Sequence, residues 1–275
     1  MSPISHDALL EIVQRAGDAI LDIYHTDFEV KSKSDESPLT QADLAAHHII
    51  ANALSELTPD IPLVSEEAEP PDFATRSRWP RYWLVDPLDG TKEFVNRNGE
   101  FTVNIALIED HEPVLGVVGV PVQDRIFVGD SAAGVARLYS GGAVSEISGG
   151  RRDVDDESLN VVASRSHGGE RLEKYLDAVT KKFPQLTRTP VGSSLKLCTL
   201  ANGDADFYPR LGPTNEWDIG AAHAVLKAAG GELYTFDDKP LKYNSKESFL
   251  NPDFYAVADR EFAWQSTLPE VPPSD

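Results

Sequence analysis

The chain has 275 residues, with 45 acidic and 25 basic side chains, so its formal charge is −20 at neutral pH. Nucleic-acid polymers and anionic membranes are bound by clustered lysines and arginines, so a chain this acidic is not expected to have either as its partner. The hydrophobic share of 41% is typical of a globular protein, which excludes a largely disordered chain.

The first half of the chain is expected to be α+β. Apolar residues at steps of three and four predict one amphipathic helix from Leu9 to Tyr24. A second helix is predicted from about Ala42 to the stop at Pro59, with Thr40 as its N-cap. Two short strands at 61–65 and 82–85 precede a set of β-rich runs between 101 and 148 that are separated by Gly, Pro and Asp. These runs predict an antiparallel meander.

The second half alternates strands and helices after a charged interval at 151–158. We therefore expect a boundary near residue 155, which separates residues 1–155 from residues 156–275. Strands are expected at 159–165, 186–190, 205–209 and 232–236, helices at 170–183, 194–201 and 217–229, and a loose tail after about 263. Two layered halves, α+β and then α/β, predict a ligand site in the cleft between them.

Cysteine usage and hydropathy predict the compartment. Cys198 is the only cysteine, which suits the reducing cytoplasm. The longest nearly apolar run, 114–122, is about half of a membrane span, so no transmembrane segment is expected.

The run Asp86-Pro87-Leu88-Asp89-Gly90-Thr91 follows a predicted strand directly. Pro87 is expected to end the strand and Gly90 to permit a tight turn, so that two carboxylates and the carbonyl of Leu88 can face one point. Such oxygen donors suit Mg²⁺ or Mn²⁺. Asp-Pro and Asp-Gly are also ordinary turn sequences, so this run alone leaves both interpretations open.

Further acidic residues are candidates for the same site. Glu66 and Glu67 follow a predicted strand, and a parallel neighbour would bring them beside Asp86. Asp218 and Asp43 are each expected near the start of a helix, where an acidic residue can simply complement the helix dipole. From the residues alone, a metal site and helix-end charges are both open.

The sequence resembles the inositol monophosphatase superfamily of metal-dependent phosphatases in three strings and in their order: SEE at 65–67, WLVDPLDGT at 83–91 and WDIGAAHAVLKAAGG at 217–231. Five more strings are similar to the CysQ-type 3'(2'),5'-bisphosphate nucleotidases: DGTKEF at 89–94, NGEFTVNIALI at 98–108, SRSH at 164–167, GSSLK at 192–196 and YPRLGPTNEWD at 208–218. The resemblance extends from about residue 5 to residue 258. It implies a layered αβαβα sandwich of the sugar-phosphatase type.

The resemblance also implies two to three Mg²⁺ ions, with Mn²⁺ as an alternative. Glu66, Asp86 and the carbonyl of Leu88 would hold one ion. Asp86, Asp89 and Asp218 would hold a second, with Asp86 shared between the two, and a third ion would bind more weakly near Glu66. Divalent ions placed in this way suit phosphoryl transfer.

The remaining catalytic roles implied by the resemblance fall to Asp43 and Thr91, which would orient the attacking water. Glu66 belongs to the catalytic set as well as to the metal ligands, and Glu67 would support the ligands from behind.

The implied substrate is a small anion, adenosine 3',5'-bisphosphate, hydrolysed to AMP and phosphate in nucleotide recycling during sulfate assimilation. The sulfated precursor nucleotide is a second candidate substrate, and lithium inhibition is expected. The candidate substrate contacts are Glu66, Leu88, Asp89, Gly90, Thr91, Ser164, His167, Ser194, Lys196, Arg210 and Asp218.

Several alternatives stay open. Lys196 can be a surface lysine, His167 a loop histidine and Arg210 the partner of a carboxylate. The chain can also be an inositol mono- or bisphosphate phosphatase, a sugar bisphosphatase, or a catalytically silent metal- or nucleotide-binding homologue. A homodimer and peripheral association with the inner face of the membrane are left open as well.

Overall fold

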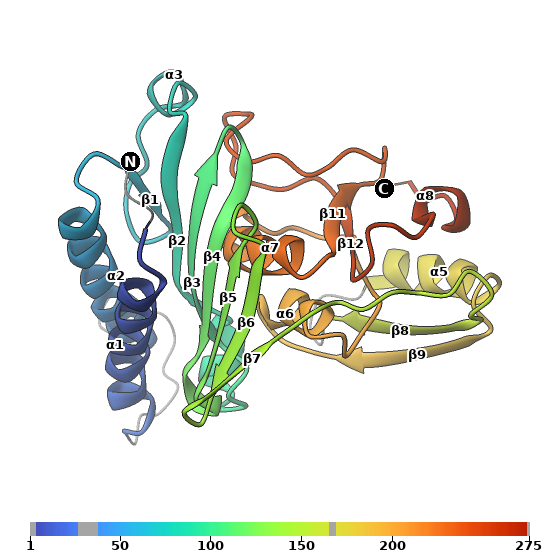
Figure 1. The fold of residues 1–275 in the computed structure, drawn as a ribbon, viewed down its shortest axis with the longest axis horizontal. Coiled ribbons are helices and arrows are strands. Elements are labelled where there is room, and N and C mark those ends of the chain that lie inside the picture. Colours follow the sequence, from blue (N-terminus) through green and yellow to red (C-terminus); the bar gives the residue numbers. More distant parts are fainter. Residues whose placement is uncertain (1–3, 27–37, 165–168, 274–275) are drawn as a thin grey trace.

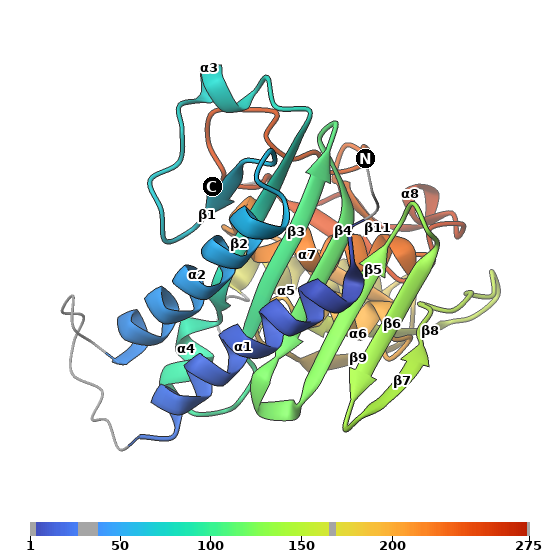
Figure 2. The same cartoon turned by 60° about the vertical axis from the view of Figure 1, so that its left-hand side comes forward.

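The helices and strands form five layers in the order α, β, α, β, α (Figure 1). The structure is a computed structural model that describes residues 4–26, 38–164 and 169–273. Two long helices, α1 (His6–Tyr24) and α2 (Pro38–Leu57), cover the outer face of the first sheet (Figure 2). The middle layer contains α6 (Leu195–Ala201) and α7 (Glu216–Ala228), and the outer face of the second sheet carries α5 (Gly169–Thr180) and α8 (Trp264–Thr267). The predicted αβαβα sandwich is confirmed.

The first sheet has seven strands that lie in chain order. They are β1 (Leu63–Ser65), β2 (Arg81–Asp89), β3 (Thr102–Glu109), β4 (Glu112–Val120), β5 (Arg125–Asp130), β6 (Val135–Ser140) and β7 (Ala143–Glu146). β1 and β2 are parallel, and each later pair is antiparallel, which confirms the predicted meander. Three short helices connect strands of this sheet: α3 (Phe73–Arg76), α4 (Thr91–Val95) and the 3₁₀ turn η1 (Pro121–Gln123).

The second sheet has five strands in the order β11-β12-β10-β8-β9. They are β8 (Ser158–Ala163), β9 (Gln185–Pro190), β10 (Phe207–Arg210), β11 (Glu232–Thr235) and β12 (Phe254–Val257). β8 is parallel to β9 and β10, whereas β12 is antiparallel to both of its neighbours. The sequence analysis missed β12, a strand of four buried residues.

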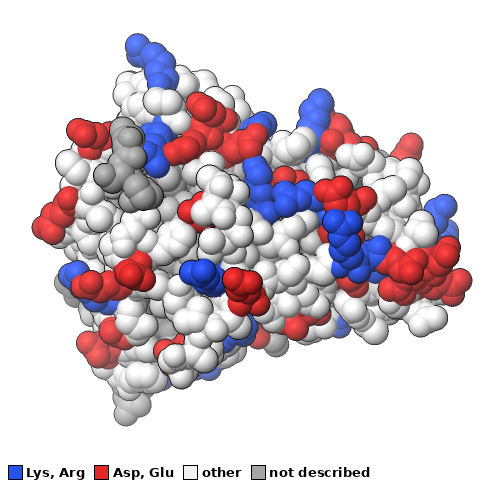
Figure 3. All heavy atoms as spheres, in the orientation of Figure 1, with Lys and Arg blue, Asp and Glu red and all other residues white. Residues whose placement is uncertain are grey.

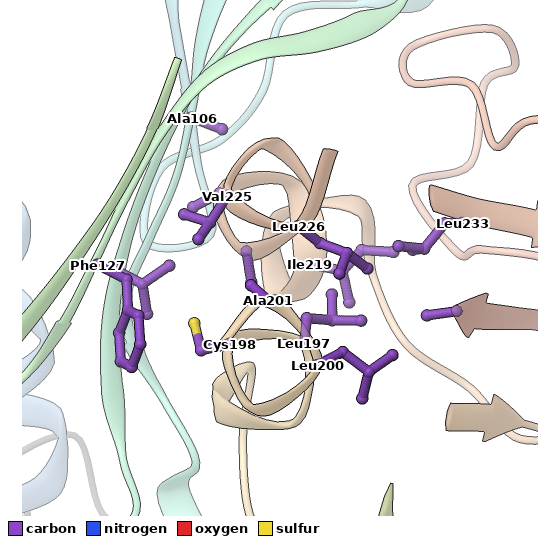
Figure 4. Close-up of a cluster of buried hydrophobic side chains, with 14 of the residues drawn as sticks. Ala106, Phe127, Leu197, Cys198, Leu200, Ala201, Ile219, Val225, Leu226 and Leu233 are labelled. Carbon is purple, nitrogen blue, oxygen red and sulfur yellow. The ribbon is translucent and has the colours of Figure 1, made fainter. Parts of the chain in front are cut away.

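The middle layer packs tightly between the two sheets. In Figure 4, side chains of α6 and α7 fill the space between Phe127 of the first sheet and Leu233 of the second. Two strand glycines permit the close approach of α7, because a Cβ on Gly116 would lie 2.1 Å from the carbonyl oxygen of Ala221 and a Cβ on Gly129 would lie 2.3 Å from Cα of Val225. The first sheet and α7, which follows it in the chain by some 70 residues, therefore share one core.

Three local predictions were wrong. Thr40 is not an N-cap, because α2 already begins at Pro38. Pro87 does not end its strand, since β2 continues to Asp89 through a shift in register between Asp86 and Asp89, where no ladder N–H is required of proline. The tail after 263 is not loose at its start, because Trp264 is 2% exposed and stacks on Phe207.

Candidate active site

Carboxylates from three separate elements meet at the C-terminal end of β2. One oxygen each from Glu66, Asp86 and Asp218 lies within 4.8 Å of the other two. The parallel pairing of β1 with β2 sets Ser65 opposite Val85, and the backbone N–H of Glu66 donates to the carbonyl of Val85 (3.1 Å). The prediction that a parallel neighbour would bring Glu66 beside Asp86 is therefore confirmed.

The end of β2 supplies a further carboxylate through a tight turn. Gly90 has a φ of 96°, in the left-handed region that favours glycine, and α4 begins at the next residue, Thr91. Asp86 Oδ1 accepts a hydrogen bond from the backbone N–H of Leu88 (3.1 Å). Asp89 accepts one from the backbone N–H of Ser194, which joins this turn to the loop before α6.

Burial and crowding raise the pKa of every carboxyl group in the cluster. For Asp86, which is 1% exposed, burial and then the neighbouring Glu66 and Asp89 raise the pKa well above its usual value. Loss of water contact is also the main cause that raises the pKa of Asp89 to about 7, of Asp218 to about 6, and of the more exposed Glu66 to about 7. A positive charge among these groups would offset both the loss of solvation and the repulsion between the ionised carboxylates.

The donor set fits a hard divalent cation. The clustered ligand atoms are carboxylate oxygens, with no imidazole or thiolate among them, as Mg²⁺ and Mn²⁺ prefer. Asp43 of α2 lies close by and is 7% exposed, and its Oδ1 has no hydrogen-bond partner among the described residues. Burial, followed by the charges of Glu67 and Glu66, raises its pKa to about 8. These residues therefore fit a site that holds a cation and a polar small molecule such as water.

A cleft that is open to solvent is lined by Asp89 and Asp218 and also by two basic side chains, Lys196 and Arg210. Lys196 Nζ donates to the carbonyl of Ser193 (2.6 Å), and burial lowers its pKa to about 8 against the opposing effect of Asp89. The guanidinium of Arg210 donates to the backbone carbonyls of Gly212 (3.1 Å) and Pro213 (2.5 Å). The cleft is therefore lined by acidic and basic side chains together.

Most of the predicted substrate contacts line this cleft: Asp89, Gly90, Thr91, Ser164, Ser194, Lys196, Arg210 and Asp218. Leu88 is buried beneath it, Glu66 belongs to the carboxylate cluster, and His167 lies outside the described residues. The surface-lysine alternative for Lys196 is wrong, since that residue is 6% exposed.

The structure also corrects the expected environment of Ser194. Its hydroxyl is buried and hydrogen-bonds to Thr102 Oγ1 (2.8 Å) and Asn104 Oδ1 (2.8 Å) on β3. Thr102 and Asn104 were not singled out from the sequence, because nothing local links them to a serine some 90 residues away.

Tyr208 is a cleft residue that the sequence analysis missed. It precedes Arg210 by two positions on β10, and residues two apart on a strand point to the same side. The aromatic ring lies 5.6 Å from Lys196 Nζ. Strand periodicity could have identified Tyr208 once Arg210 was a candidate.

The acidic excess is spread over the surface. On the face in Figure 3, Asp and Glu side chains occur in several places, with Lys and Arg side chains among them. No helix in the described part of the chain is long and apolar enough to cross a membrane.

Comparisons with known proteins show which sequences and folds this chain is similar to. The sequence model of the Inositol monophosphatase family matches residues 6–264. The 3'(2'),5'-bisphosphate nucleotidase CysQ of Escherichia coli (strain K12) is 48% identical over 253 residues, which cover 90% of this chain and 97% of that protein. The crystal structure of CysQ from Bacteroides thetaiotaomicron has a TM-score of 0.83 at 40% identity and covers 92% of this chain and 97% of that chain. An inositol monophosphatase from Zymomonas mobilis shares the fold, with a TM-score of 0.74 at 22% identity over 95% of this chain and 96% of that chain.

Proposed function

This chain belongs to the inositol monophosphatase family, and on that premise we propose that it is a Mg²⁺-dependent 3'(2'),5'-bisphosphate nucleotidase. It removes the 3'-phosphate of adenosine 3',5'-bisphosphate to give AMP and phosphate, and the sulfated precursor nucleotide is a second substrate. The observation that carries the proposal is a carboxylate cluster beside a cleft that Lys196 and Arg210 also line.

The metal ligands are Glu66, Asp86, Asp89, Asp218 and the carbonyl of Leu88. Two to three Mg²⁺ ions, or Mn²⁺ in their place, supply positive charge that neutralises the reacting phosphate and lowers the pKa of the attacking water. The chain's part is to hold these oxygens together, because like charges in a buried cluster otherwise separate or take up protons.

Asp43 and Thr91 orient the attacking water. Asp43 Oδ1 is buried without a hydrogen-bond partner in the described part of the chain, so it is free to accept a hydrogen bond from water. Thr91 lines the cleft next to Gly90 and offers a hydroxyl on the substrate side. The two residues come from different elements, α2 and the start of α4.

Lys196 and Arg210 bind the phosphate that is not hydrolysed. Lys196 and Arg210 are both buried to more than nine-tenths, and both donate to backbone carbonyls, so their positive ends are held in place before a ligand arrives. Charge-assisted hydrogen bonds from two such groups favour a bisphosphate over a monophosphate. Ser164, which follows β8 and lines the cleft, contacts the sugar in this proposal.

Steady-state phosphate release tests the substrate assignment. The specificity constant for adenosine 3',5'-bisphosphate should exceed that for inositol 1-phosphate, and Arg210→Lys should reduce this preference because lysine lacks the planar fork of donors. A higher specificity constant for inositol 1-phosphate would instead assign the chain as an inositol phosphatase. A chain that bound Mg²⁺ but released no phosphate from either ester would be a silent homologue.

A further inference from the structure

The buried guanidinium of Arg76 joins two segments that are far apart in the sequence. Arg76 ends α3, in the connection between β1 and β2, and is 2% exposed. Its guanidinium donates to Asn244 Oδ1 and to the backbone carbonyls of Lys246 (3.3 Å) and Glu247. Figure 2 shows α3 beside the red-orange segment that follows β11. Asn244 returns a hydrogen bond from Nδ2 to the carbonyl of Arg76 (2.7 Å).

The same segment after β11 is attached to the first residue of α7. Glu216 is fully buried, and its Oε2 accepts a hydrogen bond from the backbone N–H of Asn244 (2.8 Å). Its own backbone N–H donates to the carbonyl of Phe249 (2.9 Å). Asn244 has a φ of 50°, which turns its backbone N–H toward Glu216 and its side chain toward Arg76. A buried carboxylate is therefore connected to a buried arginine through one asparagine.

Aromatic contacts reinforce this connection. The Arg76 guanidinium lies 4.1 Å from the ring centroid of Phe249 and 4.9 Å from that of Phe73. Trp217, the residue between Glu216 and Asp218, packs on Phe249 with centroids 4.9 Å apart. Polar and aromatic contacts thus hold the first turn of α7 to the β1–β2 connection.

We propose that Arg76, Asn244 and Glu216 are positioning residues for the metal site, and this inference rests on the proposed function. The two strands that flank the β1–β2 connection lead to Glu66 and Asp86, and α7 carries Asp218 two residues after Glu216. The network holds Asp218 beside the other two carboxylates before any cation binds, against their mutual repulsion. We name these three residues the Arg76 clamp.

A weakened clamp should lower cation affinity more than turnover. When the first turn of α7 is free to move, the carboxylates separate in the metal-free protein, and the cation must restore their arrangement on binding. Loss of residues that orient ligands typically costs 10- to 100-fold in metal affinity. At saturating cation the ligands are drawn together again, so the maximal rate should change by about threefold at most.

Two variants test the clamp, and one buried arginine supplies a matched control. Arg76→Lys keeps the charge but loses the fork of donors, and Asn244→Gly removes the linking amide where glycine tolerates the positive φ. The control is Arg152→Lys, at an arginine with a side chain 3% exposed. Its guanidinium donates to the carbonyls of Asp156 (2.8 Å) and Ser158 and lies 4.9 Å from the Phe183 ring centroid, in the second-sheet half.

The measurements are Mn²⁺ binding to metal-free protein by calorimetry, thermal unfolding, and phosphate release as a function of Mg²⁺ concentration. We expect both clamp variants to bind Mn²⁺ about tenfold more weakly and to need correspondingly more Mg²⁺ for half-maximal rate, while Arg152→Lys loses stability without loss of affinity. If the clamp variants that fold bind Mn²⁺ with an affinity within twofold of the parent's, the clamp proposal is overturned and the proposed function is not. Failure of the parent protein to bind Mn²⁺ or Mg²⁺ would overturn the proposed function, and this proposal with it.

Discussion

Replacing Asp218 by asparagine is expected to stabilise the metal-free protein and to abolish its activity. Burial is the main cause that raises the pKa of Asp218 from 3.8 to about 6, so the folded protein holds its ionised form at a cost. A difference of about two pH units corresponds to about 3 kcal/mol. Asparagine has no charge and keeps an oxygen that can accept the hydrogen bond that Asn215 N–H now donates to Asp218 Oδ2 (2.9 Å).

An opposing effect reduces this gain. The negative charge of Asp218 lies in the first turn of α7, where it is favoured by the helix dipole by about 0.5–1 kcal/mol. The net stabilisation should then be about 2 kcal/mol, since the burial cost is the larger of the two. For a chain of this size that corresponds to a rise in Tm of about 4–8 °C.

The pH dependence identifies the origin of the gain. Between pH 3.8 and about 6, folded metal-free protein retains a proton on Asp218 that the unfolded chain has lost, so the contribution of Asp218 to stability falls as the pH rises through this window and is then constant. Asparagine does not titrate. The advantage of the variant should be complete above pH 6 and should vanish toward pH 4.

Thermal unfolding in EDTA at several pH values measures this difference, with the parent protein as reference. Two results would refute the claim that the ionised form of Asp218 destabilises the metal-free protein. One is a variant that is less stable than the parent at pH 8. The other is a difference in stability that does not shrink toward pH 4.

Other predictions concern packing, metal and inhibition. Gly129→Ala should lower the free energy of unfolding in urea by about 2 kcal/mol or more, because its Cβ would lie 2.3 Å from Val225 Cα. Gly212→Ala should leave this free energy unchanged, because a Cβ there would have no atom within 4 Å. Equal losses in the two variants would contradict the close approach of α7. Saturating Mg²⁺ should raise Tm more at pH 8 than at pH 5.5. The pKa values of Glu66 and Asp89 are raised to about 7, so both groups are largely protonated at pH 5.5, and protonated carboxyl groups bind Mg²⁺ poorly. An equal rise in Tm at the two pH values would place the ion elsewhere. Asp89→Ala should lose turnover while its circular dichroism is retained, and unchanged activity would remove Asp89 from the metal site. Lithium should inhibit phosphate release in the millimolar range, and an enzyme indifferent to lithium would argue against the assigned subfamily.

Features with a local signal could be predicted from the sequence. The helical periodicity from Leu9 to Tyr24 and the turn-separated runs between 101 and 148 each reflect a burial pattern within one element. The run from Asp86 to Gly90 combines ligand chemistry with turn chemistry in five residues. Its candidacy as a site was strengthened by the predicted parallel pairing of β1 with β2, which the structure bears out, and the ligand set itself came from the family resemblance.

Features that depend on distant partners could not be predicted. Pro87 looks like a strand end unless the bulge that accommodates it is known. Trp264 lies in a polar tail, and its burial against Phe207 becomes evident only once the second sheet is formed. Arg76 lies in a connection rich in charge and proline, in the short helix α3, and its partner Asn244 follows 168 residues later, so no periodicity marks either residue as buried.

The central claim is that carboxylates from the end of β1, from β2 and from α7 form one divalent-cation site at the cleft. Crystals soaked with Mn²⁺ and measured near the manganese absorption edge test it directly. We predict anomalous density peaks within bonding distance of Glu66, Asp86, Asp89 and Asp218. The crystals should come from protein that releases phosphate from adenosine 3',5'-bisphosphate with Mn²⁺ in solution. The absence of any peak among these residues in such crystals would contradict the claim.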